Sequence, residues 1–170
     1  MSQIADTESI QIVQIDETSL RRLIASEPID IGDLRVLDGA LPPYKTVDRA
    51  LTQLGLGTPP LWCVPFLIIC TSHKALLGAC GFKTAPVNGS VEISYGIARS
   101  GRGRGVATLA ISKLLQLAAA SGQVQQVVAH ILPDNVASSR LASRLGFIAG
   151  PLVVDGDGER VVPWVCRVAT

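Results

Sequence analysis

The spacing of apolar and polar residues changes along the chain, and the changes mark successive elements. Residues 10–15 (IQIVQI) alternate between apolar and polar side chains, which is typical of a half-buried strand. Asp16 is suited to cap a helix, and leucine and isoleucine at helical spacing predict that helix over 19–25. Residues 28–43 are rich in Gly, Asp and Pro and are expected to be irregular, whereas apolar spacing predicts a second helix over 46–54.

Strands dominate the next part of the chain. Apolar runs predict strands over 64–71 and 75–83. The dipeptide Asn88-Gly89 is a strong hairpin signal, because both residues tolerate the backbone that a two-residue turn requires. We therefore expect residues 90–97 to return antiparallel to 75–83.

The last third alternates helices and strands. An apolar stripe after Gly105 predicts a helix that ends at Gly122. The elements expected after it are a strand over 125–132, a helix over 136–145 closed by Gly146, and a hairpin of strands 147–154 and 160–168. This order predicts an α+β fold: a mixed, mostly antiparallel sheet of about seven strands with about four helices.

Composition limits the class of protein. Of the 170 residues 48% are hydrophobic and 17% are charged, which favours one globular domain over residues 1–170. The net charge of +1 gives no general attraction to nucleic acid or acidic membranes. No apolar run reaches membrane-spanning length, and the first residues lack the pattern of a signal peptide, so a cytoplasmic location is expected.

The four cysteines form no C-x-x-C pair and sit singly in apolar segments: Cys63, Cys70, Cys80 and Cys166. We interpret them as reduced, buried small hydrophobic residues. A catalytic cysteine or a metal site is the alternative, but no local histidine or ligand motif marks either. No metal is expected.

The most informative segment is 94–107, SYGIARSGRGRGVA, a strand-like run that breaks into a basic, glycine-rich turn before a helix. The N–H groups and the dipole at a helix start bind phosphate oxygens, and glycines let the backbone come close to them. A plain glycine turn is the alternative. The segment lacks the P-loop pattern, and a dinucleotide site fits poorly because the glycines follow a hairpin strand.

A second motif follows after Leu132, in PDNVASSRLASRLGF. The two motifs together resemble the GNAT superfamily of acyl-CoA-dependent N-acyltransferases, most closely the branch of ribosomal-protein N-terminal alanine acetyltransferases. The pyrophosphate loop of that family matches Arg102, Gly105 and Ala107, and V-E-I-S-Y-G-I is similar to its fourth strand. Its later signature matches Asn135, Ser138, Leu141, Arg144, Gly146 and Phe147.

The resemblance implies a sheet that splays between its fourth and fifth strands and binds acetyl-CoA. It implies a donor-binding core over about 75–147 and an acceptor side over about 16–60. The coenzyme-binding residues implied are Tyr95, Ile97, Arg102, Gly103, Arg104, Gly105, Val106, Ala107, Thr108, Asn135 and Ser138. Asn135 would contact the pantetheine arm or cap the turn, and the residues leave both interpretations open.

For catalysis, the resemblance implies that Glu92 takes a proton from the amine. The alternative is an exposed strand glutamate beside Lys83. Many relatives have a tyrosine acid where this chain has Ala142, so Ser138 is the remaining side-chain candidate to protonate the thiolate. The alternatives are that Ser138 only satisfies helix N–H groups and that water donates the proton. His130 is interpreted as structural, with a catalytic or substrate-contacting role as the alternative.

The sequence therefore predicts an acetyl-CoA-dependent N-acetyltransferase that acts on a primary amine. The acceptor is a protein N-terminus or a small-molecule amine, and no motif selects between them. The first alternative is a non-catalytic acyl-CoA-binding module, and the second is a nucleotide-binding protein. Homodimers are common in the family, and this sequence neither requires nor excludes one.

Overall fold

The computed structural model describes residues 9–169, which divide into two compact units. The first unit comprises Met1–Ala85 and Ser94–Lys113, and the second comprises Pro86–Ile93 and Leu114–Thr170. Strand β5 (Ser90–Ile97) and helix α3 (Val106–Ala120) contribute residues to both units. Each unit is described below by itself.

In the first unit, hydrogen bonds join the strands in the order β1-β3-β4-β5. The pairs β1–β3 and β3–β4 are antiparallel, and the short β2 runs parallel to β4. The bounds of these elements are β1 Ile10–Gln14, β2 Arg35–Val36, β3 Phe66–Cys70 and β4 Ala75–Phe82, with helices α1 Glu17–Ile24 and α2 Tyr44–Gly55. Two 3₁₀ turns, η2 (Pro60–Trp62) and η3 (Arg99–Gly101), complete the unit.

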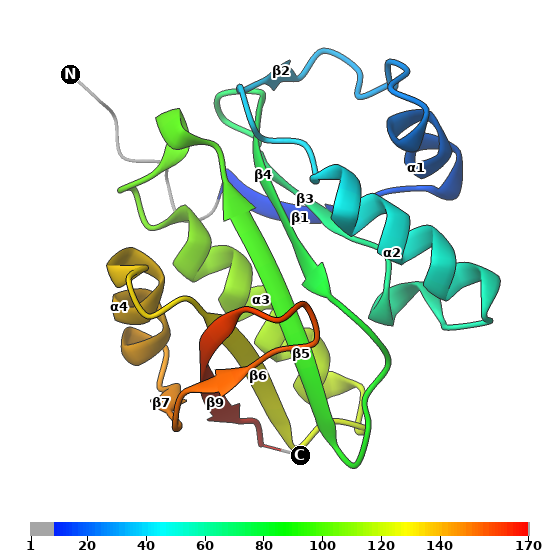
Figure 1. The fold of residues 1–170 in the computed structure, drawn as a ribbon. Coiled ribbons are helices and arrows are strands. Elements are labelled where there is room, and N and C mark those ends of the chain that lie inside the picture. Colours follow the sequence, from blue (N-terminus) through cyan, green and yellow to red (C-terminus); the bar gives the residue numbers. More distant parts are fainter. Residues whose placement is uncertain (1–8, 170) are drawn as a thin grey trace. The chain divides into compact units, whose positions relative to one another are not determined.

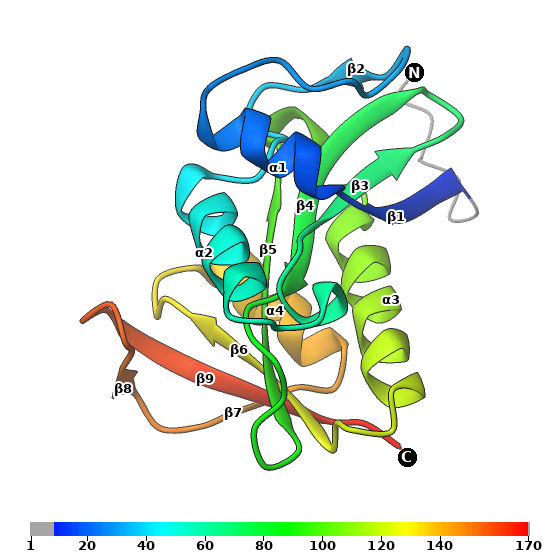
Figure 2. The ribbon, with the colours of Figure 1, turned by 90° about the vertical axis from the view of Figure 1, so that its right-hand side faces the viewer.

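The helices of the first unit cover its sheet with their apolar faces. Figure 2 shows α1 and α2 lying side by side. Asp16 caps α1 as predicted, because its Oδ1 accepts a hydrogen bond from the Ser19 N–H at 2.6 Å. The buried residues that form the core come from both helices, from strands β3 and β4 and from the segments between elements, among them Ile15, Leu20, Val47, Ala50, Leu67 and Leu76.

In the second unit, the order of hydrogen-bonded strands is β5-β6-β9-β7, with β8 also paired to β9. Figure 1 shows β9 between β6 and β7. Only β5–β6 is parallel, and the pairs of β9 with β6, β7 and β8 are antiparallel. The bounds are β6 Gln126–Ile131, β7 Ile148–Ala149, β8 Val153–Val154 and β9 Arg160–Arg167, with helix α4 Val136–Arg144.

The predicted turn and helix ends are confirmed. Asn88 and Gly89 have φ values of 50° and 75°, and Val87 and Ser90 exchange both backbone hydrogen bonds across them. Gly122 and Gly146 follow α3 and α4 with φ values of 67° and 86°. These glycines end their helices because they adopt a left-handed backbone without steric cost.

The predicted fold class is confirmed: four α-helices and a mixed, mostly antiparallel sheet are found in the described residues. The sheet has nine strands there, rather than about seven. The strand expected over 147–154 is two short strands, because Pro151 lies between them and has no N–H to donate. The other additional strand is β2, inside the segment 28–43 that was expected to be irregular.

The parallel ladder between β5 and β6 joins Ser90–Glu92 to Gln126–Val128 and ends there, although both strands continue. The resemblance implied a splay between these strands, which are the fourth and fifth predicted ones. No helix in residues 9–169 has the length and apolar character needed to cross a membrane. The single domain predicted over residues 1–170 stays a prediction.

Candidate functional site

A glycine-rich loop joins β5 to α3 in the first unit, and its shape depends on two glycines. Arg102 is extended, with φ of −77° and ψ of 161°, and Gly103 and Gly105 have φ values of 78° and 74°. Residues that carry a side chain rarely adopt such positive φ values. The Arg102 Nε donates to the Ile97 carbonyl at 3.0 Å, which ties the loop back to the end of β5.

The start of α3 presents backbone donors. The first helical hydrogen bond runs from the Leu109 N–H to the Gly105 carbonyl at 3.2 Å, so the N–H groups of Val106, Ala107 and Thr108 precede it. Gly105 has no side chain with which to cap them. A Cβ built at Gly103 or Gly105 meets no atom within 4 Å, so the space beside this loop is open.

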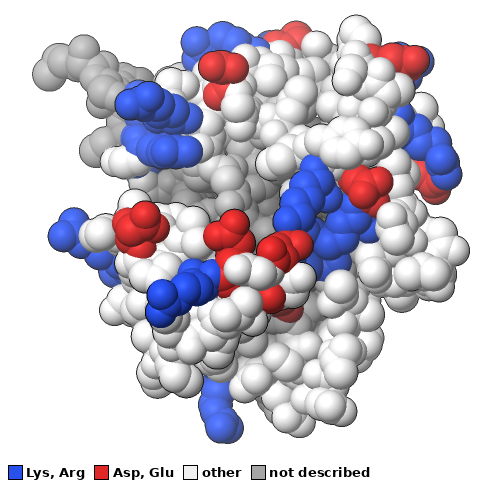
Figure 3. All heavy atoms as spheres, viewed as in Figure 1, with Lys and Arg blue, Asp and Glu red and all other residues white. Residues whose placement is uncertain are grey.

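Positive charge adds to these donors. Arg102 and Arg104 are exposed within the loop, and Arg99 is exposed just before it. Figure 3 shows basic side chains (blue) gathered at the upper left, over this loop. The N–H groups at the start of α3, its helix dipole and the guanidinium groups form a local environment that favours an anion such as a phosphate.

Tyr95 and Ile97, the other predicted binding residues of this unit, lie on β5. Tyr95 is half-buried, and the Ile97 side chain is buried with 9% exposed. Ile97 can therefore meet a ligand only through its backbone, and its carbonyl already accepts from Arg102. The same restriction holds for Val106, whose side chain is 2% exposed and anchors the start of α3.

In the second unit the structure brings Glu92 and His130 together. His130 Nδ1 lies 2.8 Å from Glu92 Oε1, with side chains that are 26% and 27% exposed respectively. The parallel register explains the contact, because Glu92 pairs with Val128 and His130 stands two residues further on the same face of β6. A carboxylate and an imidazole in contact are a combination that can hold and move a proton.

The sequence interpretation of His130 as a structural residue, with a catalytic or substrate-contacting role as the alternative, did not identify Glu92 as its partner. The signal that could have found it is the parallel pairing of β5 with β6, which places every second residue of both strands on one face. That pairing joins segments far apart in the sequence, and the motifs alone do not fix its register.

Asn135 and Ser138 lie at the start of α4. The Asn135 Oδ1 accepts from the Ser138 N–H at 3.1 Å, so Asn135 caps the helix, which was one of its two predicted roles. The Asn135 carbonyl accepts from the hydroxyl of Ser139 at 3.0 Å rather than from that of Ser138. The half-buried Ser138 hydroxyl has no hydrogen-bond partner among residues 9–169. Ligand contact by either residue stays a prediction.

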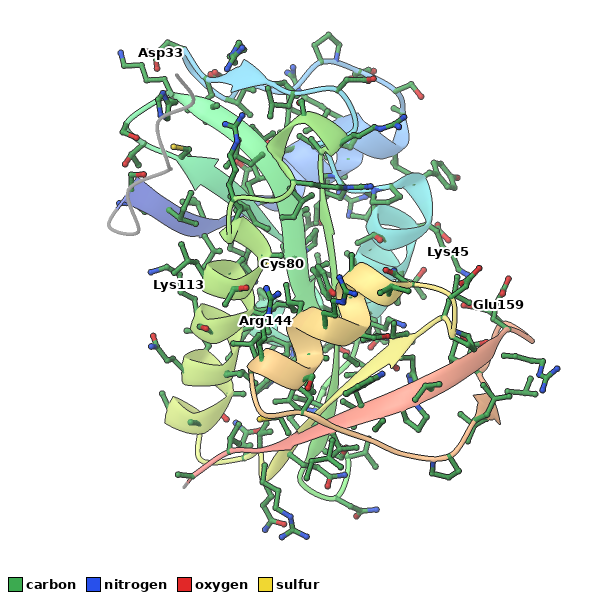
Figure 4. All side chains as sticks on the ribbon, turned by 90° about the vertical axis from the view of Figure 1, so that its left-hand side faces the viewer. Asp33, Lys45, Cys80, Lys113, Arg144 and Glu159 are labelled. Atoms are coloured by element: carbon green, nitrogen blue, oxygen red, sulfur yellow. The ribbon has the colours of Figure 1, made fainter. Side chains whose placement is uncertain are left out.

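Ala142, the position where many relatives have a tyrosine, is buried in α4 with 2% of its surface exposed. The cysteines are free, with Cys63, Cys70 and Cys80 buried and Cys166 only partly so. Burial raises the pKa of the Cys80 thiol, on β4 (Figure 4), to about 12, so it carries no thiolate at neutral pH. The described residues contain no group of three or more His, Cys, Asp or Glu side chains that could hold a metal ion.

Comparison with known proteins is consistent with an acyl-transfer site. The family described as an acetyltransferase (GNAT) domain matches residues 45–148. An uncharacterised N-acetyltransferase p20 of Bacillus licheniformis is 32% identical over 83 residues, which are 48% of this chain and 47% of that protein. The match thus spans about half the length of that curated relative.

Solved structures are similar along almost the whole chain. The acetyltransferase of Salmonella typhimurium that modifies the N-terminal serine of ribosomal protein L7/L12 aligns with a TM-score of 0.67 and 20% identity, covering 97% of this chain and 98% of that one. The spermidine N-acetyltransferase of Vibrio cholerae, solved with CoA and spermine, aligns with a TM-score of 0.64 and 15% identity, over 94% and 96%. At these identities the likeness shows the fold.

Proposed function

We propose that this chain, which belongs to the GNAT acetyltransferase family, transfers an acetyl group from acetyl-CoA to a primary amine. In this reaction the amine nitrogen attacks the thioester carbonyl carbon, the C–S bond breaks, and CoA leaves as the thiol. The attacking nitrogen must be neutral, so a protonated amine has to lose one proton first. The products are the acetylated amine, free CoA and a proton released to solvent.

The observation that carries the proposal is the start of α3. Its first N–H groups have no capping side chain at Gly105, the space beside Gly103 and Gly105 is open, and Arg102 and Arg104 supply charge. These features suit the pyrophosphate of CoA. We assign the pyrophosphate to the backbone from Gly103 to Thr108, and we assign to Tyr95 and Ile97 a backbone contact with the pantetheine arm.

Two residues of the second unit serve the chemistry in this proposal. Glu92 assists removal of the amine proton, and its partial burial beside His130 supports a role beyond that of a solvated strand glutamate. The Ser138 hydroxyl protonates the departing thiolate, since it is half-buried and not engaged by neighbours in the described chain. Asn135 sets the geometry of that helix start and offers its amide to the pantetheine arm.

Relatives of known specificity guide the choice of acceptor. The two aligned acetyltransferases modify a protein N-terminal serine and a polyamine. We propose an acceptor from the same chemical class, a primary amine that is either a protein N-terminus or a small molecule. Helices α1 and α2 belong to the segment of about 16–60 that the family resemblance assigns to the acceptor side.

The decisive experiment measures CoA thiol release from acetyl-CoA with a panel of amines. The panel comprises a peptide with an N-terminal serine, a peptide with an N-terminal alanine, spermine and an aminoglycoside. Saturable turnover with any of them supports the enzyme. Saturable binding of CoA without turnover of any amine would instead favour the acyl-CoA-binding module, and absence of CoA binding would refute both.

A further inference from the structure

We propose that His130 is the base that takes the proton from the amine, and that Glu92 is a positioning residue that acts through it. This inference rests on the proposed acetyl transfer and deepens it, because it assigns the proton to a particular nitrogen atom. Its foundation is the contact of 2.8 Å between His130 Nδ1 and Glu92 Oε1 in the second unit.

The sheet fixes this contact from both sides. Glu92 stands opposite Val128 in the parallel ladder, so its side chain shares a face with His130. On the other side of β6, His130 stands opposite Pro163 and Val128 opposite Val165 of β9. The ring therefore lies between a carboxylate and an apolar strand. On the same face of β9, the exposed Arg167 stands opposite Gln126.

The distance determines where the proton lies. Nδ1 and Oε1 both carry lone pairs, and at 2.8 Å they repel each other unless a proton lies between them. An imidazole is a stronger base than a carboxylate, so that proton resides on Nδ1. In the neutral ring the basic lone pair is then on Nε2. Among residues 9–169, His130 has no hydrogen-bond or ionic partner other than Glu92.

This arrangement suits the reaction better than a lone carboxylate does. An imidazole nitrogen is a stronger base than a carboxylate oxygen, so it is the better acceptor for the proton of an ammonium group. Nε2 takes a proton from the ammonium, the freed amine attacks the thioester carbon, and His130 carries one additional proton. The Glu92 carboxylate stabilises that imidazolium, and the proton then passes to solvent from Nε2. Both side chains are about one quarter exposed, which leaves the ring accessible.

The test compares kcat for acetylation of spermine, or of whichever panel amine the wild type turns over, among matched variants. We expect His130→Gln to lower kcat by about 100-fold, the lower end for loss of a general base, with unchanged affinity for CoA. Glu92→Gln should lower kcat by about 10-fold, and the double variant should be no slower than His130→Gln alone, because Glu92 acts through the histidine. The chain has two histidines, so His73→Gln, in an exposed turn, is the matched control.

Two further measurements separate chemistry from folding. Free imidazole should restore part of the activity of His130→Ala and none of the activity of Glu92→Ala. In the wild type, the nitrogen NMR signals of His130, assigned by their loss in His130→Gln, should show a proton on Nδ1. A proton on Nε2 in the neutral ring would overturn the inference.

The failures are distinguishable. A wild type that binds CoA but acetylates no amine overturns the proposed function and this inference together. An active wild type overturns only the inference if His130→Gln retains its rate, if Glu92→Gln loses more than His130→Gln, or if the two losses multiply in the double variant. A larger loss in Glu92→Gln, or losses that multiply in the double variant, would indicate that Glu92 is the base.

Discussion

The starts of helices α3 and α4 differ in the residue that precedes the first turn. At α4 this residue is Asn135, whose Oδ1 accepts from the Ser138 N–H at 3.1 Å. At α3 it is Gly105, which has no side chain and a φ of 74°. Within residues 9–169 the chain therefore caps α4 with its own side chain, whereas Gly105 offers the first N–H groups of α3 no side-chain acceptor.

This difference distinguishes the glycine-rich loop before α3 from the Asn135 motif at α4, although the family resemblance assigns both motifs to the binding of CoA. A helix start that is capped internally gains stability from its cap and has an acceptor already in place. A helix start with a glycine has no side-chain acceptor at that position, so its donors are available to an external anion. We therefore expect substitutions at α3 to change ligand affinity mainly, and substitutions at α4 to change stability first.

The largest effect should come from Gly105→Glu. The new carboxylate would stand where the proposed pyrophosphate binds, so we expect CoA to bind at least about 100-fold more weakly, the equivalent of about 2.7 kcal/mol. Isothermal titration with CoA measures this change. The matched control is Gly122→Glu, since Gly122 has a φ of 67° and equally open surroundings.

In both glycine variants a residue with a side chain must adopt a positive φ, which lowers the free energy of unfolding by about 1 kcal/mol each. Thermal unfolding should thus show similar decreases in Tm for Gly105→Glu and Gly122→Glu. Equal CoA affinities in the two variants would contradict the assignment of the pyrophosphate loop, and the contrast between α3 and α4 would lose its functional meaning.

The next effect concerns the arginines of the loop. Arg104→Gln removes an exposed charge and should weaken CoA binding by about 10-fold without a change in Tm. Arg102→Gln should weaken binding to a similar degree and also lower Tm, because the Arg102 Nε no longer donates to the Ile97 carbonyl. Titration and thermal unfolding of both variants provide the check. An unchanged Tm in Arg102→Gln would show that the loop keeps its shape without this bond.

These regions also show how far the sequence alone can lead. Turns and helix ends follow local rules, so the roles of Asp16, of Asn88-Gly89 and of the glycines after α3 and α4 could be predicted. The break between β7 and β8 was missed, although Pro151 marks it. The Glu92–His130 contact could not be predicted from motifs, because it depends on the register of two strands that are distant in sequence.

A smaller effect is expected at the cap of α4. Asn135→Ala should lower the free energy of unfolding by about 1 kcal/mol, because the Ser138 N–H loses its acceptor. Asn135→Asp keeps a cap oxygen and should preserve stability, as urea denaturation would show. If the Asn135 amide also contacts the pantetheine arm, Asn135→Asp weakens CoA binding at full stability. An unchanged affinity would leave Asn135 with the cap alone.

The smallest effect is the pH dependence of a charged cap, at α1. The hydrogen bond from the Ser19 N–H lowers the pKa of Asp16 below its ordinary value of 3.8. The folded state therefore gains stability from ionised Asp16 above pH 3.8, and it loses this gain as the pH falls through the lower folded value. Asp16→Asn should have a slightly lower Tm than the wild type at neutral pH, and the difference should shrink in acid.

Asn135→Asp places the same kind of charged cap at α4. Its Tm should therefore fall more steeply in acid than the Tm of the wild type. If the dependence of Tm on pH is the same in both variants as in the wild type, the caps act through their hydrogen bonds alone. Charge at a helix start would then matter only where an external anion supplies it, as we propose for α3.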